Sequence, residues 1–432
     1  MEQGRERRRD VALVPARALA VGALTGLVGG AFRIAVSLAG DVHERARSLP
    51  LPPALVSIAL GAAMVATAVF LVRRFAPEAG GSGVQEVEGA LEGVRPVRWR
   101  RVLPVKFAGG ALGLGSGLAL GREGPTIQMG GALGRLVADL LRLDAAQTHV
   151  LVASGAGAGL AAAFNAPLSG ALFVIEEMRP HFQYGVLSVQ GVLIACATAD
   201  AVVRVMLGGN PVLPLPDFTM PSLGALGLFL AFGALVGALG RLFNALLLAG
   251  LDLFAAIPDR ARVAAAGLVG GATGLLLWLR PHVVGGGYAT IDAATAGAIP
   301  AAGLLALVAA RLAATATSYA TGAPGGIFAP MVAIGALLGL WFGHACHAAW
   351  PAAVADPGVF AVAGMGALFA ATVRAPLTGI ALAAELTGEF ALILPLTVSA
   401  IGATLMAHAL GGQPIYSVLL DRTLARTPRP TA

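Results

Sequence analysis

Long, continuously apolar segments dominate the pattern of hydrophobic and polar positions along this chain. No charged residue lies between Asp144 and Glu176, and only Asp356 lies between Arg311 and Arg374. Such windows exceed the roughly 20 residues that cross a bilayer as a helix. A membrane β-barrel would alternate polar and apolar residues instead, so the pattern predicts an all-α polytopic membrane protein. The apolar segments run at about 11–39, 53–72, 107–121, 126–143, 145–175, 186–207, 223–257, 263–279, 299–343, 359–384 and 390–412.

Glycine and proline interrupt many of these segments. The chain holds 59 glycines and 26 prolines, too many for straight spans alone. Broken helices persist at membrane depth only where the freed backbone is buried in protein or lines a cavity, and small residues let helices pack closely. We therefore expect many short, broken and tilted helices.

The two halves of the chain resemble each other. The run from Gly155 to Gly170 aligns with the run from Gly364 to Gly379 at a constant offset of 209, and Glu176 then matches a second glutamate at 385. Upstream, residues 121–125 align with 326–330 at an offset of 205. Repeats in transporters often have opposite membrane topology. We expect one transmembrane domain over 1–432, with repeat halves at about 11–207 and 220–420 and no C-terminal cytoplasmic regulatory domain.

Composition and charge agree with a membrane protein. The chain is 57% hydrophobic and 12% charged, whereas soluble domains carry about 25% charged residues. The net charge of +6 reflects loop arginines and does not indicate a nucleic-acid partner. By the positive-inside rule both termini lie in the cytoplasm, and the compact chain favours a bacterial inner membrane. The terminal arginines are Arg5, Arg7, Arg8, Arg9, Arg422, Arg426 and Arg429.

Three short glycine-rich turns adjoin apolar segments, at 81–83, 121–125 and 325–330. A helix N-terminus presents free N–H groups and partial positive charge, so it binds anions without a cationic side chain. Glycine lets the backbone approach the ion closely. None of the turns is a phosphate-binding loop, because Gly-Lys-Ser/Thr is absent. If the three turns converge, they form a dehydrated anion site.

The turn at 121–125 also places a charged pair in apolar surroundings. Charge in such a position costs about 2.5–3.5 kcal/mol per residue on insertion scales. Arg122 and Glu123 therefore indicate a function such as anion binding, proton carriage or both. The equivalent turn at 326–330 keeps the glycine and the proline but carries no charge.

Together these motifs resemble those of the CLC chloride channel and transporter family, in particular its bacterial proton/chloride exchangers. The resemblance covers essentially the whole chain, with several separate motifs in the same order. It implies the CLC fold, a homodimer in the lipid bilayer, and an anion pathway in each subunit that exchanges chloride for protons. The matching segments are Gly-Ser-Gly at 81–83, Gly-Arg-Glu-Gly-Pro at 121–125, 161–170, Glu-Glu-Met-Arg-Pro at 176–180, Gly-Ile-Phe-Ala-Pro at 326–330, and Tyr416 after Gly-Gly-Gln-Pro-Ile.

The resemblance also implies roles for individual residues. The Ser82 and Tyr416 hydroxyls and the N–H groups of Ile327 and Phe328 would hold a central chloride. Glu123 would be the extracellular gate, since its carboxylate occupies an anion position until protonation releases it. Internal proton transfer to and from the cytoplasm would be the task of Glu177. The remaining motif residues would line the same path: Gly81, Gly83, Gly121, Arg122, Gly124, Pro125, Gly326, Ala329 and Pro330.

Several alternatives stay open at this point. Within the family, a chloride channel would use protons only for gating. A cation-coupled nutrient transporter would need carboxylates or carbonyls around its cation. An intramembrane enzyme would need a nucleophile and base or a metal cluster, and neither His-Glu-x-x-His nor Gly-x-Ser-x-Gly stands out. We expect no enzyme activity, no catalytic or metal-binding residue and no cofactor, with chloride and protons as the transported ions.

Individual residues also have simpler interpretations. Ser82 is a candidate helix N-cap, Tyr416 an interfacial anchor and Phe328 a packing residue. Glu176 and Glu177 could form a solvated cluster with Arg179. One departure from the family pattern is Gln85, which stands where the resemblance leads us to expect proline.

Overall fold

Helices account for nearly all of the regular structure. The computed structural model describes residues 2–46, 51–178, 185–216, 218 and 221–426. Within these ranges seventeen α-helices form, and an isolated bridge between Gly121 and Gly326 takes the place of any strand. The expectation of an all-α polytopic membrane protein is confirmed. Arg179, Pro180 and Arg429, which entered the sequence analysis, lie outside the described residues.

Eight stretches of the described chain are long and apolar enough to cross a membrane. One of them, α13, differs from the others because 78% of its most apolar window is buried, against 33–44% elsewhere. A helix that is apolar on all sides belongs inside the protein, so α13 is a core helix. The eight stretches contain α1 (Glu2–Ala46), α2 (Pro53–Phe75), α8 (Val186–Leu207), α9 (Leu226–Ala255), α10 (Arg262–Leu279), α12 (Ala301–Ala320), α13 (Phe328–Ala349) and α16 (Ile393–Ala409).

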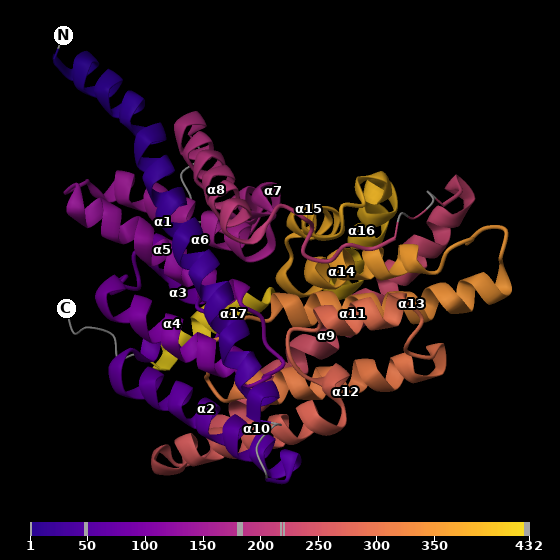
Figure 1. The fold of residues 1–432 in the computed structure, drawn as a ribbon. Helices are drawn as coiled ribbons and strands as arrows, with labels where there is room; N and C mark the ends of the chain where they lie inside the picture. The colour runs from indigo at the N-terminus through magenta and orange to yellow at the C-terminus, as the bar shows by residue number, and fades with distance from the viewer. Residues whose placement is uncertain (1, 47–50, 179–184, 217, 219–220, 427–432) are drawn as a thin grey trace.

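Nine further helices of the described chain are shorter or less apolar. Every residue of one of them, α14, is buried. Figure 1 shows the helices of the first half mainly on the left and those of the second half mainly on the right, with α17 passing near the centre. The nine are α3 (Val84–Leu91), α4 (Trp99–Gly115), α5 (Glu123–Leu140), α6 (Ala145–Phe164), α7 (Pro167–Glu176), α11 (Tyr288–Thr295), α14 (Gly358–Val373), α15 (Pro376–Thr387) and α17 (Ile415–Arg426).

Equivalent helix breaks recur in the two halves. The residue that follows α6, Asn165, has φ 54°, and the residue that follows α14, Arg374, has φ 72°. Proline begins the next helix in both cases, at Pro167 and Pro376, where its missing N–H costs no helix hydrogen bond. The apolar segments at 145–175 and 359–384 are therefore each divided into two helices.

Two glutamates cap helices of the opposite half in a reciprocal arrangement. The carboxylate of Glu176, at the end of α7, accepts hydrogen bonds from the N–H and hydroxyl of Thr378 in α15 at 2.6 and 2.7 Å. The carboxylate of Glu385, in α15, accepts from the N–H and hydroxyl of Ser169 in α7 at 2.7 and 2.5 Å. Carboxylates stabilise helix N-termini by accepting from free N–H groups. Glu176 is therefore a helix cap between the halves.

Glycine permits the closest helix crossing in each half. A side chain at Gly130 of α5 would collide with the carbonyl of Gly155 in α6, and the reverse is also true. The equivalent pair, Gly335 of α13 and Gly364 of α14, has the same relation. Backbones approach this closely only where side chains are absent.

Substituting one glycine at this crossing should destabilise the protein. We expect Gly130→Ala to lower the free energy of unfolding by about 1–3 kcal/mol, because the added methyl must push α5 and α6 apart. Thermal unfolding in detergent measures the effect. Gly303→Ala in α12 is the matched control, since a methyl there meets no atom within 4 Å. Equal melting temperatures for the two variants would contradict the packing argument.

Candidate functional site

Glu123 begins α5, and its side chain is fully buried. Its Oε1 accepts a hydrogen bond from the Phe328 N–H at 2.8 Å, and the Ala329 N–H lies at 3.4 Å. Phe328 is the first residue of α13, so the carboxylate lies at the positive end of that helix. A carboxylate of the first half therefore occupies an anion position that the second half provides.

The three glycine turns meet beside this carboxylate. The Gly121 N–H donates to the Gly326 carbonyl at 2.8 Å, and the Gly326 N–H donates back to the Gly121 carbonyl at 2.7 Å. The Gly325 N–H donates to the Gly81 carbonyl at 3.0 Å. A side chain at Gly121 or Gly326 would collide with the Glu123 carboxylate. The three glycine-rich turns therefore converge, as an anion site formed by them requires. Their close approach needs glycine at positions 121 and 326.

Two buried hydroxyls lie close together near the turns. Ser82 and Tyr416 are both fully buried, and neither hydroxyl has a hydrogen-bond partner in the described part of the chain. The two side chains are near enough to interact. A buried hydroxyl without a partner costs about 1–3 kcal/mol, so such a pair is expected to have a use. Two convergent O–H donors suit an anion.

The structure contradicts the simpler interpretations of these two residues. The residue that caps α3 is Gly83, in the left-handed conformation with φ 86°, and no side chain caps that helix. Ser82 is therefore not a helix N-cap. Tyr416 is 0% exposed, so it is not an interfacial anchor. The ring of Phe328 does pack, against the rings of Tyr416 at 5.8 Å and Phe369 at 4.6 Å between centroids.

The other motif residues contribute in different ways. A side chain at Gly124 would collide with Ser82, so glycine lets α5 approach that residue. The N–H of Ile327 makes no hydrogen bond within the described residues, which leaves it as a free donor next to the Phe328 N–H. The Arg122 side chain contacts other parts of the chain than Ser82 and Tyr416. Its Nε donates to the Ala163 carbonyl at 3.0 Å, and its guanidinium lies over the Tyr288 ring.

Glu177 follows the last residue of α7 and meets a second carboxyl group. That group belongs to Glu88 of α3, which is 4% exposed, and the two carboxyls are near enough to share a hydrogen bond. Two adjacent carboxyls do not both ionise easily, so a proton is readily held between them. Sequence reasoning missed Glu88, because 88 and 177 are far apart in the chain and no local spacing links them.

Lys106 is a second residue near the site that the sequence analysis did not identify. It lies in α4, is fully buried, and donates from Nζ to the carbonyls of Gly81 at 2.8 Å and Ala79 at 3.1 Å. It thereby fixes the turn that carries Ser82. A signal existed in the sequence, since Lys106 is the one charged residue between Arg101 and Arg122. The argument applied to Arg122 and Glu123 would have found it.

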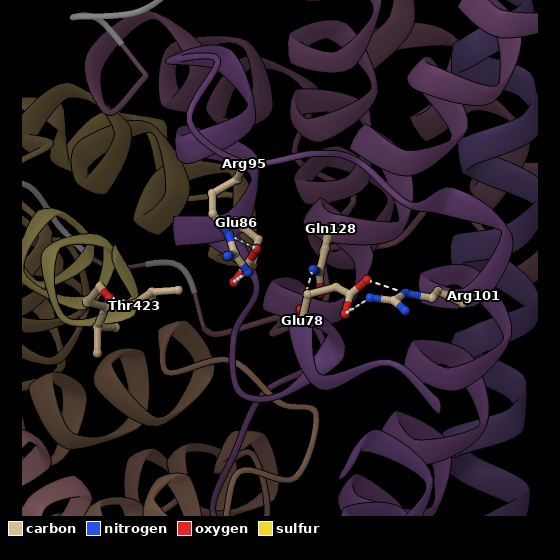
Figure 2. Close-up of polar contacts among 7 residues, drawn as sticks. Glu78, Glu86, Arg95, Arg101, Gln128 and Thr423 are labelled. Atoms are coloured by element: carbon tan, nitrogen blue, oxygen red, sulfur yellow. Dashed lines mark hydrogen bonds and ion pairs between the residues drawn. The ribbon is translucent and has the colours of Figure 1, made fainter. Parts of the chain in front are cut away.

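A cavity of about 610 Å³ reaches the turn at 81–83 from one side. Six arginines and two glutamates line it, so the positive charge in its walls raises the local anion concentration. Figure 2 shows two ion pairs in this region, Glu86 with Arg95 and Glu78 with Arg101, between α17, which carries Thr423, and α4. Their N···O distances are 2.9 and 2.6 Å.

Gln85 lines the same cavity and occupies the second position of α3. Its N–H has no backbone acceptor in the described structure, whereas the N–H groups of Glu86 and Val87 donate to the Gly83 carbonyl. A proline at this position would therefore lose no helix hydrogen bond. Glutamine instead adds a side-chain amide, whose Oε1 is buried without a partner.

Comparisons with known proteins identify relatives over nearly the whole chain. The family described as voltage gated chloride channel matches residues 64–408. A protein of Vibrio cholerae serotype O1 named H(+)/Cl(-) exchange transporter ClcA is 51% identical over 416 residues, which cover 94% of this chain and 88% of the relative. A protein of the same name from Salmonella agona is 47% identical over 417 residues, covering 95% and 88%.

Solved structures share the fold. The crystal structure of a slow cyanobacterial Cl−/H+ antiporter superposes with a TM-score of 0.92 at 39% identity, covering 96% of this chain and 99% of that one. A CLC-type fluoride/proton antiporter superposes with a TM-score of 0.77 at 20% identity, covering 92% and 96%. The second likeness concerns the fold alone.

Proposed function

Because this chain belongs to the voltage-gated chloride channel family, we propose that it exchanges chloride for protons across a membrane. The observation that carries the proposal is the Glu123 carboxylate hydrogen-bonded to the Phe328 N–H at 2.8 Å. An ionised carboxylate and a chloride ion compete for the same donors there. Protonation of the carboxylate ends that competition, which links the movement of the proton to the movement of the anion.

The central anion position in this proposal lies between Ser82 and Tyr416. Chloride would accept hydrogen bonds from their two hydroxyls, which otherwise have no partner in the described chain. The free N–H of Ile327 and the N–H of Phe328, once Glu123 releases it, would add donors from the start of α13. When protonated, Lys106 would favour the anion through its charge, and its hydrogen bond to the Gly81 carbonyl would hold the turn that carries Ser82.

The second proton station in this proposal is Glu177 with Glu88. Their paired carboxyls can hold one proton between them and release it toward water. The Tyr416 hydroxyl lies within electrostatic range of both Glu123 and Glu177. Proton and anion paths would therefore share the region around Glu123 and diverge on the other side of Tyr416. This division explains why two separate glutamates are needed.

The protein is an integral, multi-pass membrane protein. We propose further that it resides in a bacterial inner membrane as a homodimer, with both termini in the cytoplasm. The arginine-lined cavity at the 81–83 turn would then open to the cytoplasm, because positive side chains favour that side. Glu123 would control access from the opposite side.

The decisive experiment is a coupled-flux assay in proteoliposomes. A chloride gradient imposed across the vesicle membrane should drive protons uphill in the opposite sense, measured with a pH electrode alongside a chloride electrode. Protein-free vesicles serve as the control. Large chloride flux with no proton movement would overturn exchange and favour a chloride channel of the same family.

A further inference from the structure

An apolar groove of about 670 Å³ lies between α2 and α10, which pack side by side along the lower edge of Figure 1. Every residue that lines it is alanine, glycine, leucine or isoleucine, from 58–66 of α2 and 264–275 of α10. We propose that the groove binds one acyl chain of an anionic phospholipid, whose headgroup lies against the arginines at one end. The inference goes beyond the proposed function and does not depend on chloride or proton transport.

The crossing of the two helices does not account for the whole groove. A side chain at Gly61 of α2 would collide with the carbonyl of Gly270 in α10, and the reverse is also true. These two glycines are therefore required for packing. Gly267 and Gly271 differ from them, because a methyl group at either position would come no closer than 3.4 Å to any atom of α2. Helix packing tolerates a side chain at these two positions, whereas an open groove does not.

The groove faces the membrane. Both helices belong to stretches that are long and apolar enough to cross a bilayer. Leu268 at its edge is 77% exposed, and Ala63 and Ala272 are exposed beside it. The groove is about 17 Å long from Ala264 to Leu275, at 1.5 Å per helical residue. One leaflet contributes about 15 Å of hydrocarbon, so the groove matches a single chain that enters from one side of the membrane.

The ends of the two helices bring arginines together at one end of the groove. The helices are antiparallel, since Ser57 near the start of α2 meets Gly274 near the end of α10. The last turn of α2 therefore lies beside the start of α10, where Arg73 pairs with Asp259 at 3.5 Å. Arg262 pairs with the same carboxylate at 2.7 Å. One aspartate is thus shared by two arginines.

Two more arginines at this end have no ion pair within the described residues. Arg74 is in the last turn of α2, and its guanidinium lies 5.5 Å from the centroid of the Phe75 ring. Arg260 comes directly before α10, one helical turn from Ala264 of the groove. Both are exposed. Clusters of basic side chains at the membrane surface attract anionic lipids, so this end of the groove suits a phosphate headgroup that carries a net negative charge.

A photoactivatable lipid locates the chain in the wild-type protein. Liposomes would contain phosphatidylglycerol with a diazirine on one acyl chain, and mass spectrometry would identify the labelled peptides. We expect stronger labelling at 58–66 and 264–275 than in α12, which is also apolar and partly exposed. Unlabelled phosphatidylglycerol should compete, and phosphatidylcholine should not. Labelling no stronger than in α12, or equal competition by the two lipids, would overturn the proposal.

Native mass spectrometry of the purified protein measures lipid affinity. Ala63→Phe should fill the groove and weaken phosphatidylglycerol binding about 10-fold or more. Arg74→Gln and Arg260→Gln should each weaken it about 5-fold. The matched controls are Ala306→Phe in α12 and Arg280→Gln after α10, which should bind as the wild type does. All five side chains are exposed, so the fold should persist in every variant.

The comparison of each variant with its control decides the outcome. Equal affinities in Ala63→Phe and Ala306→Phe would overturn the proposal, as would equal affinities in both arginine variants and Arg280→Gln. The same spectra report the number of subunits, which should be unchanged in Ala63→Phe. A smaller assembly in that variant would show that the groove holds a second copy of the chain instead of a lipid.

Discussion

The Glu123→Gln variant is expected to move chloride without moving protons. Glutamine keeps the shape of the side chain, and its amide oxygen can still accept from the Phe328 N–H. It carries no charge and takes up no proton, so it neither competes as an anion nor serves as a proton carrier. We expect proton flux in the coupled assay to fall about 100-fold or more, while chloride flux persists at an altered rate.

The matched control for this experiment is Glu176→Gln. Glu176 is also a carboxylate bonded to helix N–H groups, at 2.6 Å from the Thr378 nitrogen, but it lies outside the anion path. Its neutral variant should keep the wild-type proton-to-chloride ratio, although the protein will be less stable. Wild-type coupling in Glu123→Gln would remove Glu123 from the role of gate.

Loss of either buried hydroxyl should weaken central chloride binding. Tyr416→Phe and Ser82→Ala each delete an O–H that has no partner in the described protein but would donate to chloride. A hydrogen bond to a charged group contributes about 1.5–3 kcal/mol, so each variant should raise the dissociation constant about 10-fold or more. Calorimetric titration of the purified protein with chloride measures the change.

The stability of these variants separates the binding role from a structural one. Deleting a partnerless buried hydroxyl should not lower the melting temperature in chloride-free buffer, because no internal hydrogen bond is lost. Thr25→Val in α1 is the control, since the Thr25 hydroxyl is likewise buried without a partner. It should leave chloride affinity unchanged. An affinity for Tyr416→Phe equal to that of the wild type would reduce Tyr416 to a packing residue.

Local patterns in the sequence predicted the scaffold of the site. The glycine turns, the helix starts at proline and the charged pair at 122–123 all depend on neighbours in the chain. Hydropathy alone did not predict every position at which an apolar segment divides into two helices. The segment at 299–343 looks continuous in hydropathy, yet α12 ends at Ala320 and α13 begins at Phe328, because the glycine-rich turn between them serves the site.

Contacts between distant segments could not be predicted in the same way. Residues 88 and 177 are 89 positions apart, and the Glu123–Phe328 hydrogen bond joins residues 205 positions apart. The Arg122 guanidinium likewise lies over the ring of Tyr288 in α11, in the other half. Such pairs result from how whole helices pack, and periodicity within one helix does not encode them. The residue roles assigned from the resemblance stay predictions until the variants are measured.

The reciprocal glutamate caps have a mechanical consequence. Glu176 and Glu385 join α7 to α15 twice, and the Gly121–Gly326 bridge adds another tie between the halves. In many repeat transporters one half rocks against the other. Here such a motion would separate two half-buried carboxylates from their N–H and hydroxyl donors at the same time. We therefore expect the two halves to move together as one body, so that transport depends on the movement of a few side chains, and of the Glu123 side chain in particular.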